Sequence, residues 1–136
     1  MNGASIIYKT ILQRTIALLS TEAEFYALAD AGKATLYMRS VLHDLNITQH
    51  QPTVIYEDNR GCLKMMQALK PMKRTRHVDT KYFAILNWVQ TDQLEIKKID
   101  TSDNAADVLT KALGRILFYR HMDTILGRHI PDFSDV

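Results

Sequence analysis

The chain has 136 residues, of which 46% are hydrophobic and 24% are charged, and it contains only five glycines and three prolines. A chain of this length suits one domain with a sizeable core, and this composition excludes extensive disorder. The formal net charge of +2 is too small to favour or exclude any class of partner by itself.

Cysteine and histidine usage excludes two kinds of site. Cys62 is the single cysteine, so the sequence offers no intramolecular disulfide and no cysteine-based zinc site, and the five histidines show no metal-ligand spacing. The first residues have no apolar run behind a basic flank, and no later window approaches about eighteen uninterrupted apolar residues. We therefore expect a soluble intracellular protein, cytoplasmic or nuclear, without membrane contact.

The first half of the chain predicts one long helix between two extended segments. Residues 5–19 are rich in isoleucine and threonine and predict one or two strands, or a strand and its approach. Over residues 21–45 the apolar positions recur mostly at steps of three and four, which predicts a long amphipathic helix. A polar connection follows at 46–52, and the β-branched and aromatic run at 53–57 predicts a short buried strand.

Two further helices are predicted around a proline break. We expect a short helix over 59–68, a basic loop over 70–77 and a second amphipathic helix over 78–89, because the residue before a proline disfavours helical dihedrals. The larger apolar and sulfur-containing side chains on these helices are predicted to belong to the core; they are Cys62, Met65, Met66 and Trp88.

The last third of the chain predicts a strand followed by two helices. The strand covers 94–99, and Ser102 or Asp103 can cap a helix that contains Asp107 and ends before Gly114. The last helix is expected over 116–126. Alternation of strands and helices along the whole chain predicts an α/β domain with some parallel strand pairing.

Three acids lie where a functional crevice is expected. In α/β sheets this crevice forms beyond the carboxyl ends of the strands, where helices begin. Glu24 lies near the start of the long helix, Asp58 directly follows the strand at 53–57, and Asp107 follows the strand at 94–99. Clustered carboxylates repel one another and need a compensating cation, for which Mg²⁺ or Mn²⁺ is suited because it prefers oxygen ligands.

Each acid also has a purely structural interpretation. Glu24 lies three residues after Thr21 and can complete a capping box. Asp58 can cap the helix that follows it, and Asp107 can lie favourably near the positive end of a helix dipole. Spacing alone does not decide between caps and metal ligands, so both interpretations stay open at this point.

Four stretches carry a resemblance to one family. In chain order they are A-L-L-S-T-E-A-E-F-Y-A-L-A-D-A at 17–31, I-Y-E-D-N at 55–59, K-R-T-R-H-V-D-T-K-Y-F at 73–83 and N-A-A-D-V-L-T-K-A-L at 104–113. Together, over about residues 3–126, they resemble the ribonuclease H domain of copia-type (Pseudoviridae) long-terminal-repeat retrotransposon polyproteins. The resemblance implies a ribonuclease H-like domain at 1–126 and a C-terminal tail at 127–136.

The resemblance also implies an activity and its residues. The family fold is a five-stranded mixed sheet flanked by helices, and the family activity is metal-dependent cleavage of the RNA strand in RNA–DNA hybrids. It implies that Glu24, rather than Glu22, is the helix carboxylate of the active site, with Asp58 as the strand-end aspartate and Asp107 as the late one. These three catalytic and metal-binding acids would belong to a four-acid site for two Mg²⁺ or Mn²⁺ ions.

One family residue has no counterpart in this sequence. The family carries another aspartate on an upstream first strand, whereas no acid precedes Glu22 here. We therefore expect a sheet that lacks its first strand or strands, an impaired metal site, and weak or absent nuclease activity for this chain alone. Because a sheet without those strands exposes backbone and apolar surface, we also expect a homodimer formed through the sheet edge.

A basic stretch accompanies the third matching segment. From residue 64 to 81 six lysines and arginines stand against Asp79 alone, a local excess of five positive charges. Beside the aromatic Tyr82, these cations suit the phosphates of a nucleic acid, although a solvated surface loop is the simpler alternative. The candidates for contact with an RNA–DNA hybrid are Lys70, Lys73, Arg74, Arg76, His77 and Lys81.

Three functions remain to be distinguished. The first is a ribonuclease H-like enzyme with an incomplete acid site, and the second is a non-catalytic module that keeps the fold and basic surface for binding nucleic acid or protein. The third is a co-opted host or pathogen regulatory factor whose partner surface is the exposed sheet edge.

Overall fold

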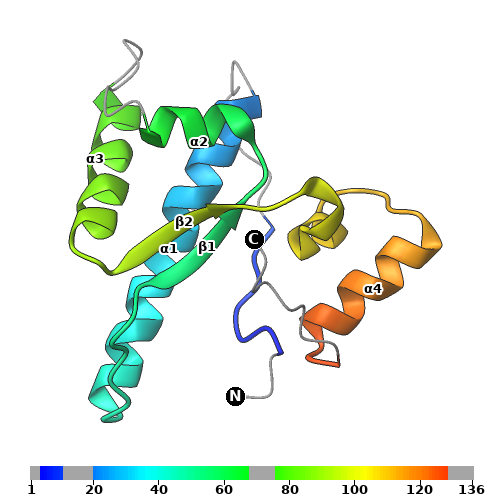
Figure 1. The fold of residues 1–136 in the computed structure, drawn as a ribbon, viewed down its shortest axis with the longest axis horizontal. Helices are drawn as coiled ribbons and strands as arrows, with labels where there is room; N and C mark the ends of the chain where they lie inside the picture. Colours follow the sequence, from blue (N-terminus) through cyan, green and yellow to red (C-terminus); the bar gives the residue numbers. More distant parts are fainter. Residues whose placement is uncertain (1–3, 11–19, 68–75, 129–136) are drawn as a thin grey trace. The chain divides into compact units, whose positions relative to one another are not determined.

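A computed structural model describes residues 4–10, 20–67 and 76–128 of the chain (Figure 1). The chain divides into two compact units. One is Thr15–Lys98, called here the sheet unit, and the other combines Met1–Arg14 with Ile99–Val136, called here the C-terminal unit. Among the residues in these ranges, no helix combines the length and the apolar character needed to cross a membrane.

The sheet unit pairs two parallel strands that are joined through two helices. Its elements are, in order, α1 (Ser20–Asp44), β1 (Thr53–Glu57), α2 (Arg60–Gln67), α3 (Arg76–Gln90) and β2 (Leu94–Lys98). The strands pair in register from Thr53 opposite Leu94 to Glu57 opposite Lys98. This arrangement confirms the predicted α/β class with parallel pairing, and the long helix and both strands lie close to where the sequence predicts them.

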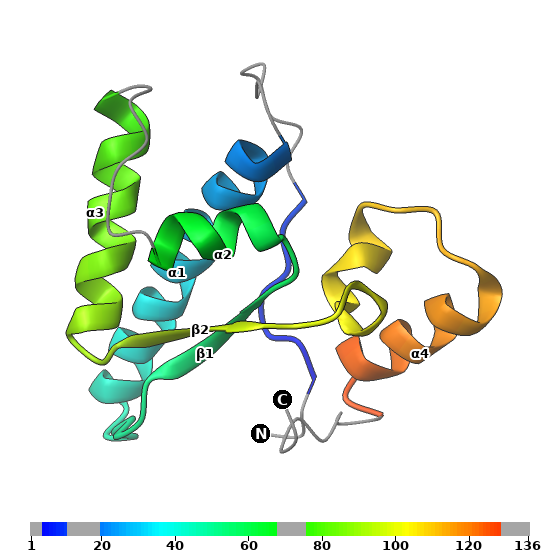
Figure 2. The same ribbon diagram turned by 45° about the horizontal axis from the view of Figure 1, so that its top comes forward.

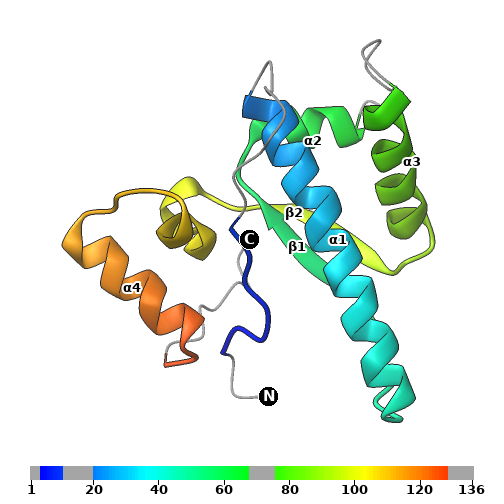
Figure 3. The same cartoon turned by 180° about the vertical axis from the view of Figure 1, so that it is seen from behind.

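The core lies between the sheet and its helices. Ile55 and Ile96 are register partners, and both pack against a cluster from all three helices that comprises Phe25, Leu28, Ala29, Cys62, Tyr82 and Ile85. The view from behind in Figure 3 shows α1 running across the two strands on this side. Met65, Met66 and Trp88 pack partly buried against the same cluster, and Cys62 is fully buried, which confirms the predicted core positions.

Two non-glycine residues with left-handed backbone close the helices that lead into the strands. Asn46 after α1 has a φ of 60°, and the N–H groups of Asn46 and Ile47 donate to the carbonyls of His43 and Leu42, both at 2.8 Å. Asp92 after α3 repeats this pattern with a φ of 54°. These Schellman-type ends satisfy the last carbonyls of each helix and turn the chain toward the next strand.

One arginine fixes the connection between α1 and β1. The Arg39 guanidinium donates to the carbonyl of Gln51 at 2.8 Å, to Thr53 Oγ1 at 2.9 Å and to the carbonyl of Gln49 at 3.1 Å. The planar guanidinium therefore holds every second residue from Gln49 to Thr53 against α1.

The C-terminal unit consists of short helical elements. Two 3₁₀ helices, η1 (Thr101–Asp103) and η2 (Ala105–Leu109), precede α4 (Arg115–Ile125). Arg120 on α4 forms an ion pair with Asp103 at 2.6 Å. The N-terminal residues belong to this unit, since the Ser5 N–H donates to the Ile125 carbonyl at 2.8 Å.

Two local predictions are wrong, and a third is tested only in part. Of the extended segment predicted over 5–19, residues 5–10 form no strand and the Ser5 amide donates to the Ile125 carbonyl at the end of α4, whereas residues 11–19 lie outside the described ranges. The segment after β2 is 3₁₀ rather than α-helical, because Asp107 N–H bonds to Asn104 O and Thr110 N–H bonds to Asp107 O. Its second part is capped by Asn104 rather than by Ser102 or Asp103.

Candidate active site

The junction between β1 and α2 is built by side chain to backbone hydrogen bonds. The Asn59 side chain accepts hydrogen bonds from the N–H groups of Gly61 at 2.8 Å and Cys62 at 3.1 Å, so Asn59 caps α2. The structural interpretation of Asp58 as this cap is therefore wrong. Asp58 lies half-buried between the strand and the cap, where its carboxylate is not required to start the helix.

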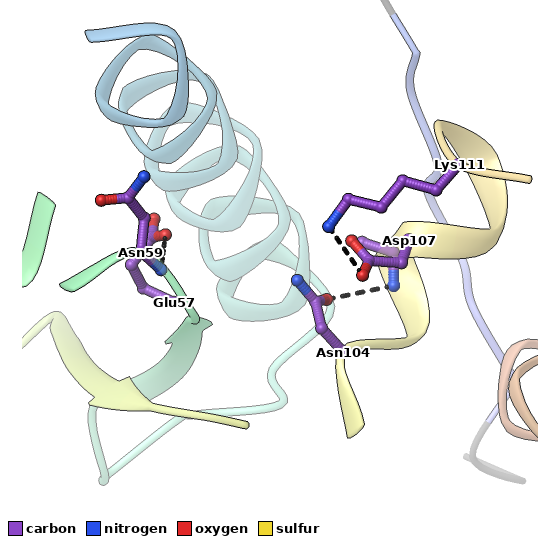
Figure 4. Close-up of polar contacts among 6 residues, drawn as sticks. Glu57, Asn59, Asn104, Asp107 and Lys111 are labelled. Carbon is purple, nitrogen blue, oxygen red and sulfur yellow. Dashed lines mark hydrogen bonds and ion pairs between the residues drawn. The ribbon is translucent and has the colours of Figure 1, made fainter. Parts of the chain in front are cut away.

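Glu57, one residue earlier, is a buried acid at the same junction. It has a relative exposure of 6%, and its carboxylate accepts the Asn59 backbone N–H at 2.9 Å, as the sheet-unit half of the close-up in Figure 4 shows. Strand alternation accounts for this burial, because Glu57 is in phase with Ile55 and so faces the helices rather than solvent.

Two of the three predicted site acids, Glu24 and Asp58, raise the pKa of Glu57. Burial raises the pKa of Glu57, and the negative charges of Glu24 and Asp58 raise it further, against the hydrogen bonds from Asn59 and Cys62, which lower it. The structure thus gathers Glu24 from α1 and Asp58 from the end of β1 around one interior carboxylate. Thr21, the proposed capping partner of Glu24, lies inside α1 and faces the Gly61 position of α2.

The thiol of Cys62 is part of this arrangement. It donates a hydrogen bond to the Glu57 carboxylate, and it is fully buried. Burial, followed by the charge of Glu57, raises the pKa of Cys62. Cys62 is therefore a protonated donor and core side chain, rather than a reactive thiolate.

Asp107 belongs to the C-terminal unit and has a different environment. It is buried, with a relative exposure of 6%, and its Oδ2 lies 2.8 Å from the Lys111 ammonium (Figure 4). Asn104 caps the same 3₁₀ helix by accepting the Ala106 N–H at 3.2 Å. Asp107, the third predicted acid, is thus paired with the positive charge of Lys111, four residues further along the chain.

The basic candidates fall into three groups. Lys70, Lys73 and Arg74 lie outside the described residues. Arg76 and His77 open α3, so the expected basic loop over 70–77 is wrong at its last two positions. Lys81, one turn further along α3, lies 4.1 Å from the centroid of the Tyr26 ring on α1.

Tyr82 does not accompany these cations at a surface. Its side chain has a relative exposure of 1%, and its ring packs 6.2 Å from the Phe25 ring in the core. Burial raises the pKa of its hydroxyl, which finds no hydrogen-bond partner among the described residues. The aromatic ring beside Lys81 is instead Tyr26, whose hydroxyl donates to Glu22 at 3.4 Å.

Three curated proteins are similar to most of the chain. The chain is 32% identical over 117 residues to the retrovirus-related Pol polyprotein from transposon TNT 1-94 of Nicotiana tabacum, a match that covers 86% of this chain and 9% of the polyprotein. It is 34% identical over 106 residues to the Pol polyprotein from transposon RE2 of Arabidopsis thaliana, a match that covers 78% of this chain and 7% of that polyprotein. It is 32% identical over 119 residues to the Pol polyprotein from transposon RE1 of the same plant, which covers 88% of this chain and 8% of that polyprotein. The homologues of this chain are retrovirus-related Pol polyproteins.

The chain spans less than a tenth of the length of each of these Pol polyproteins. No family model matches it, and no solved structure matches it. The sequence similarity alone therefore supports a Pol-related origin.

The acids near the end of β1 offer the kind of donor that a hard divalent cation prefers. Glu24, Glu57 and Asp58 have only carboxylate oxygens, and the pKa of Glu57 is raised first by burial and then by the charges of Glu24 and Asp58. In the parts of this Pol-related chain that the structure describes, no three His, Cys, Asp or Glu side chains are grouped so as to hold a metal ion. Glu24 and Asp58 are the pair closest to that role, and Asp107 lies in the other unit.

Sequence reasoning missed two residues of these sites. Glu57 could have been found, because the alternation T-V-I-Y-E places it on the same face as Ile55. Lys111 could have been found as a cation four residues after Asp107.

Proposed function

We propose that this chain is a ribonuclease H-like domain derived from a copia-type retroelement polyprotein, whose ancestral activity is hydrolysis of the RNA strand of RNA–DNA hybrids with Mg²⁺ or Mn²⁺ and whose activity is weak or absent in this chain alone. The observation that carries the proposal is the gathering of Glu24 and Asp58, from α1 and the end of β1, around the buried Glu57. Homology to Pol polyproteins from three plant transposons supports the retroelement origin.

The proposed roles follow from the family resemblance, residue by residue. Glu24 and Asp58 would hold the divalent ion, and the resemblance assigns Asp107 to the same set of ligands; the ion would supply an activated water and stabilise charge on the phosphoryl group. Asp107 pairs with the Lys111 ammonium. The basic residues from Lys70 to Lys81 would hold phosphates of the hybrid near these acids.

The cleavage test uses matched carboxylate variants. A labelled RNA–DNA hybrid is incubated with Mg²⁺ and with the wild-type chain, Glu24→Gln or Asp58→Asn. We expect weak Mg²⁺-dependent cleavage of the RNA strand by the wild-type chain and its loss in either variant. Glu95→Gln and Asp44→Asn are the controls, since their carboxylates are largely exposed elsewhere in the sheet unit, and should retain wild-type rates.

A non-catalytic hybrid-binding module is the second candidate. The ion pair between Asp107 and Lys111 favours it, because an acid that is already neutralised is less available to a metal ion. Hybrid binding without cleavage, weakening as salt rises, would support this module. Charge reversal at Arg74 and Arg76 should weaken binding and flatten its salt dependence, and unchanged binding would remove the basic segment from the proposal.

The proposal extends to a second copy of the chain as a partner. Within the described residues β1 and β2 pair only with each other, so each strand keeps one edge without a neighbouring strand. Pairing of such edges between two chains would give a homodimer. Light scattering at micromolar concentration should report twice the chain mass of 15.6 kDa, and a monomer would contradict it.

A further inference from the structure

Glu57 is a buried ionisable side chain to which the proposed chemistry gives no task. Its position on the core face of β1 takes a carboxylate out of water, which is costly unless hydrogen bonds compensate. Two donors do so: the Asn59 backbone N–H at 2.9 Å and the Cys62 thiol. Both donors come from the chain just beyond Asp58, so these bonds fold the junction back onto the strand end.

Asn59 fixes the other side of the same junction. Its side-chain oxygen accepts from Gly61 and Cys62, which ties the residue after Asp58 to the first turn of α2. Asp58 therefore lies between Glu57 and Asn59, which are joined by the hydrogen bond from the Asn59 N–H to the Glu57 carboxylate. These bonds restrict rotation of the backbone on both sides of its Cα, which fixes the Cα–Cβ direction from which the Asp58 carboxylate extends.

We propose that Glu57 is a positioning residue for Asp58: its carboxylate, by accepting the Asn59 amide, fixes the backbone from which Asp58 presents its own carboxylate. This inference rests on the proposed function, in which Asp58 holds a divalent ion. Small errors in direction matter there, because Mg²⁺ requires near-octahedral ligands at about 2.0–2.1 Å. Groups that orient metal ligands in this way typically contribute about 10–100-fold to metal affinity.

The test separates the hydrogen bond from the charge of Glu57. Glu57→Gln keeps an acceptor oxygen at the same distance along the side chain, whereas Glu57→Met keeps the length and removes the acceptor. Glu95→Met, on the neighbouring strand with a half-exposed carboxylate, is the matched control. Three quantities are measured on the folded full chain: the hydrogen-exchange rate of the Asn59 amide, the side-chain rotamer couplings of Asp58, and the affinity for Mn²⁺ from paramagnetic broadening.

We expect Glu57→Met to speed exchange of the Asn59 amide about tenfold or more, to average the Asp58 rotamer couplings, and to weaken Mn²⁺ binding about tenfold. Glu57→Gln should stay within about threefold of wild type in all three, which a purely structural loss of a buried side chain would not explain. Equal impairment by both variants would overturn the inference, because it would mean that the charge rather than the acceptor matters.

The two proposals fail in different ways. If wild type binds no Mn²⁺ but Asp58 loses its single rotamer in Glu57→Met, the proposed metal function is wrong and the positioning role stands. If Asp58 keeps its rotamer in Glu57→Met, the positioning role is wrong whatever the metal does. Should Glu57→Met not fold, Glu57→Asp, which shortens the reach to the Asn59 amide by one methylene, takes its place with the same expected outcomes.

Discussion

The β1–α2 junction and the η2 segment both start a helix with an asparagine cap, but the charges around their buried acids are opposite in sign. Each follows a strand, each presents an aspartate, and each begins its helix with an asparagine whose side chain accepts backbone N–H groups. At the junction, Glu24 and Asp58 add negative charge around the buried Glu57, whereas in η2 the buried Asp107 meets the Lys111 ammonium. The comparison teaches that one region places further negative charge near a buried acid, whereas the other supplies its buried acid with a cation of its own.

The largest expected effect comes from removing the built-in cation. Lys111→Met leaves the buried Asp107 carboxylate without its ammonium and should lower the free energy of unfolding by about 2 kcal/mol. Lys97→Met is the control, because its ion pair with Glu95 is half-exposed at both ends and should be worth less than about 1 kcal/mol. Urea denaturation of the two variants checks this, and equal losses would erase the distinction between the two regions.

A second prediction compares how tightly the two units are packed. A Cβ at Gly32 would lie 2.7 Å from Trp88 Cζ3 and 3.0 Å from Cε3, whereas a Cβ at Gly114 meets nothing within 4 Å. Gly32→Ala should therefore destabilise by about 1–2 kcal/mol, the overpacking cost less the helix-propensity gain of alanine. Gly114→Ala should change stability by less than about 0.5 kcal/mol. Thermal unfolding of both variants measures the difference, and a neutral Gly32→Ala would show that the Trp88 ring can move aside.

The two asparagine caps offer a more direct comparison. Asn59→Ala removes two hydrogen bonds at the start of an α-helix that contributes Cys62 to the core, and should cost about 1 kcal/mol. Asn104→Ala removes one longer hydrogen bond at an exposed 3₁₀ helix and should cost about half as much. Denaturant midpoints of the paired variants test the order, and a larger loss at Asn104 would reverse it.

The smallest effect is a pH dependence that only the junction should show. Because the folded-state pKa of Glu57 is raised, the folded chain binds that proton more tightly than the unfolded chain does. Ionised Glu57 therefore lowers stability increasingly as pH rises above the ordinary value of 4.5 toward the raised one. Glu57→Gln should be more stable than wild type at pH 8 and similar near pH 4, as measured by urea midpoints. A constant difference across this range would mean that Glu57 titrates normally.

Regular elements with a strong periodic pattern could be predicted from the sequence. The β-branched run at Thr53–Glu57 and the apolar steps of α1 each reflect burial of one face, and burial decides these elements. The 3₁₀ segment could not be predicted in the same way, because A-A-D-V-L has ordinary helix propensity and only the Asn104 cap and the turn at Thr110 tighten it. Nor could the choice of cap at α2, since Asp58 and Asn59 are equally good caps one residue apart.

The candidate site shows a similar division. Glu24 and Asp58 could be assigned to the ends of a helix and a strand from the sequence alone, and the charges of both raise the pKa of Glu57. The sequence does not reveal that Asp107 is buried, which is what makes its ion pair with Lys111 important. Local chemistry at the ends of elements is therefore where the sequence is least informative.

The Arg39 clamp has a consequence for how the chain tolerates changes in length. Since its guanidinium holds Gln49, Gln51 and Thr53 at fixed places along α1, a one-residue insertion or deletion before β1 would shift the strand by one position. Side chains alternate between faces, so Asp58 and Glu57 would exchange interior and exterior places. The number of residues in a surface loop thus decides which of two adjacent acids the protein turns inward.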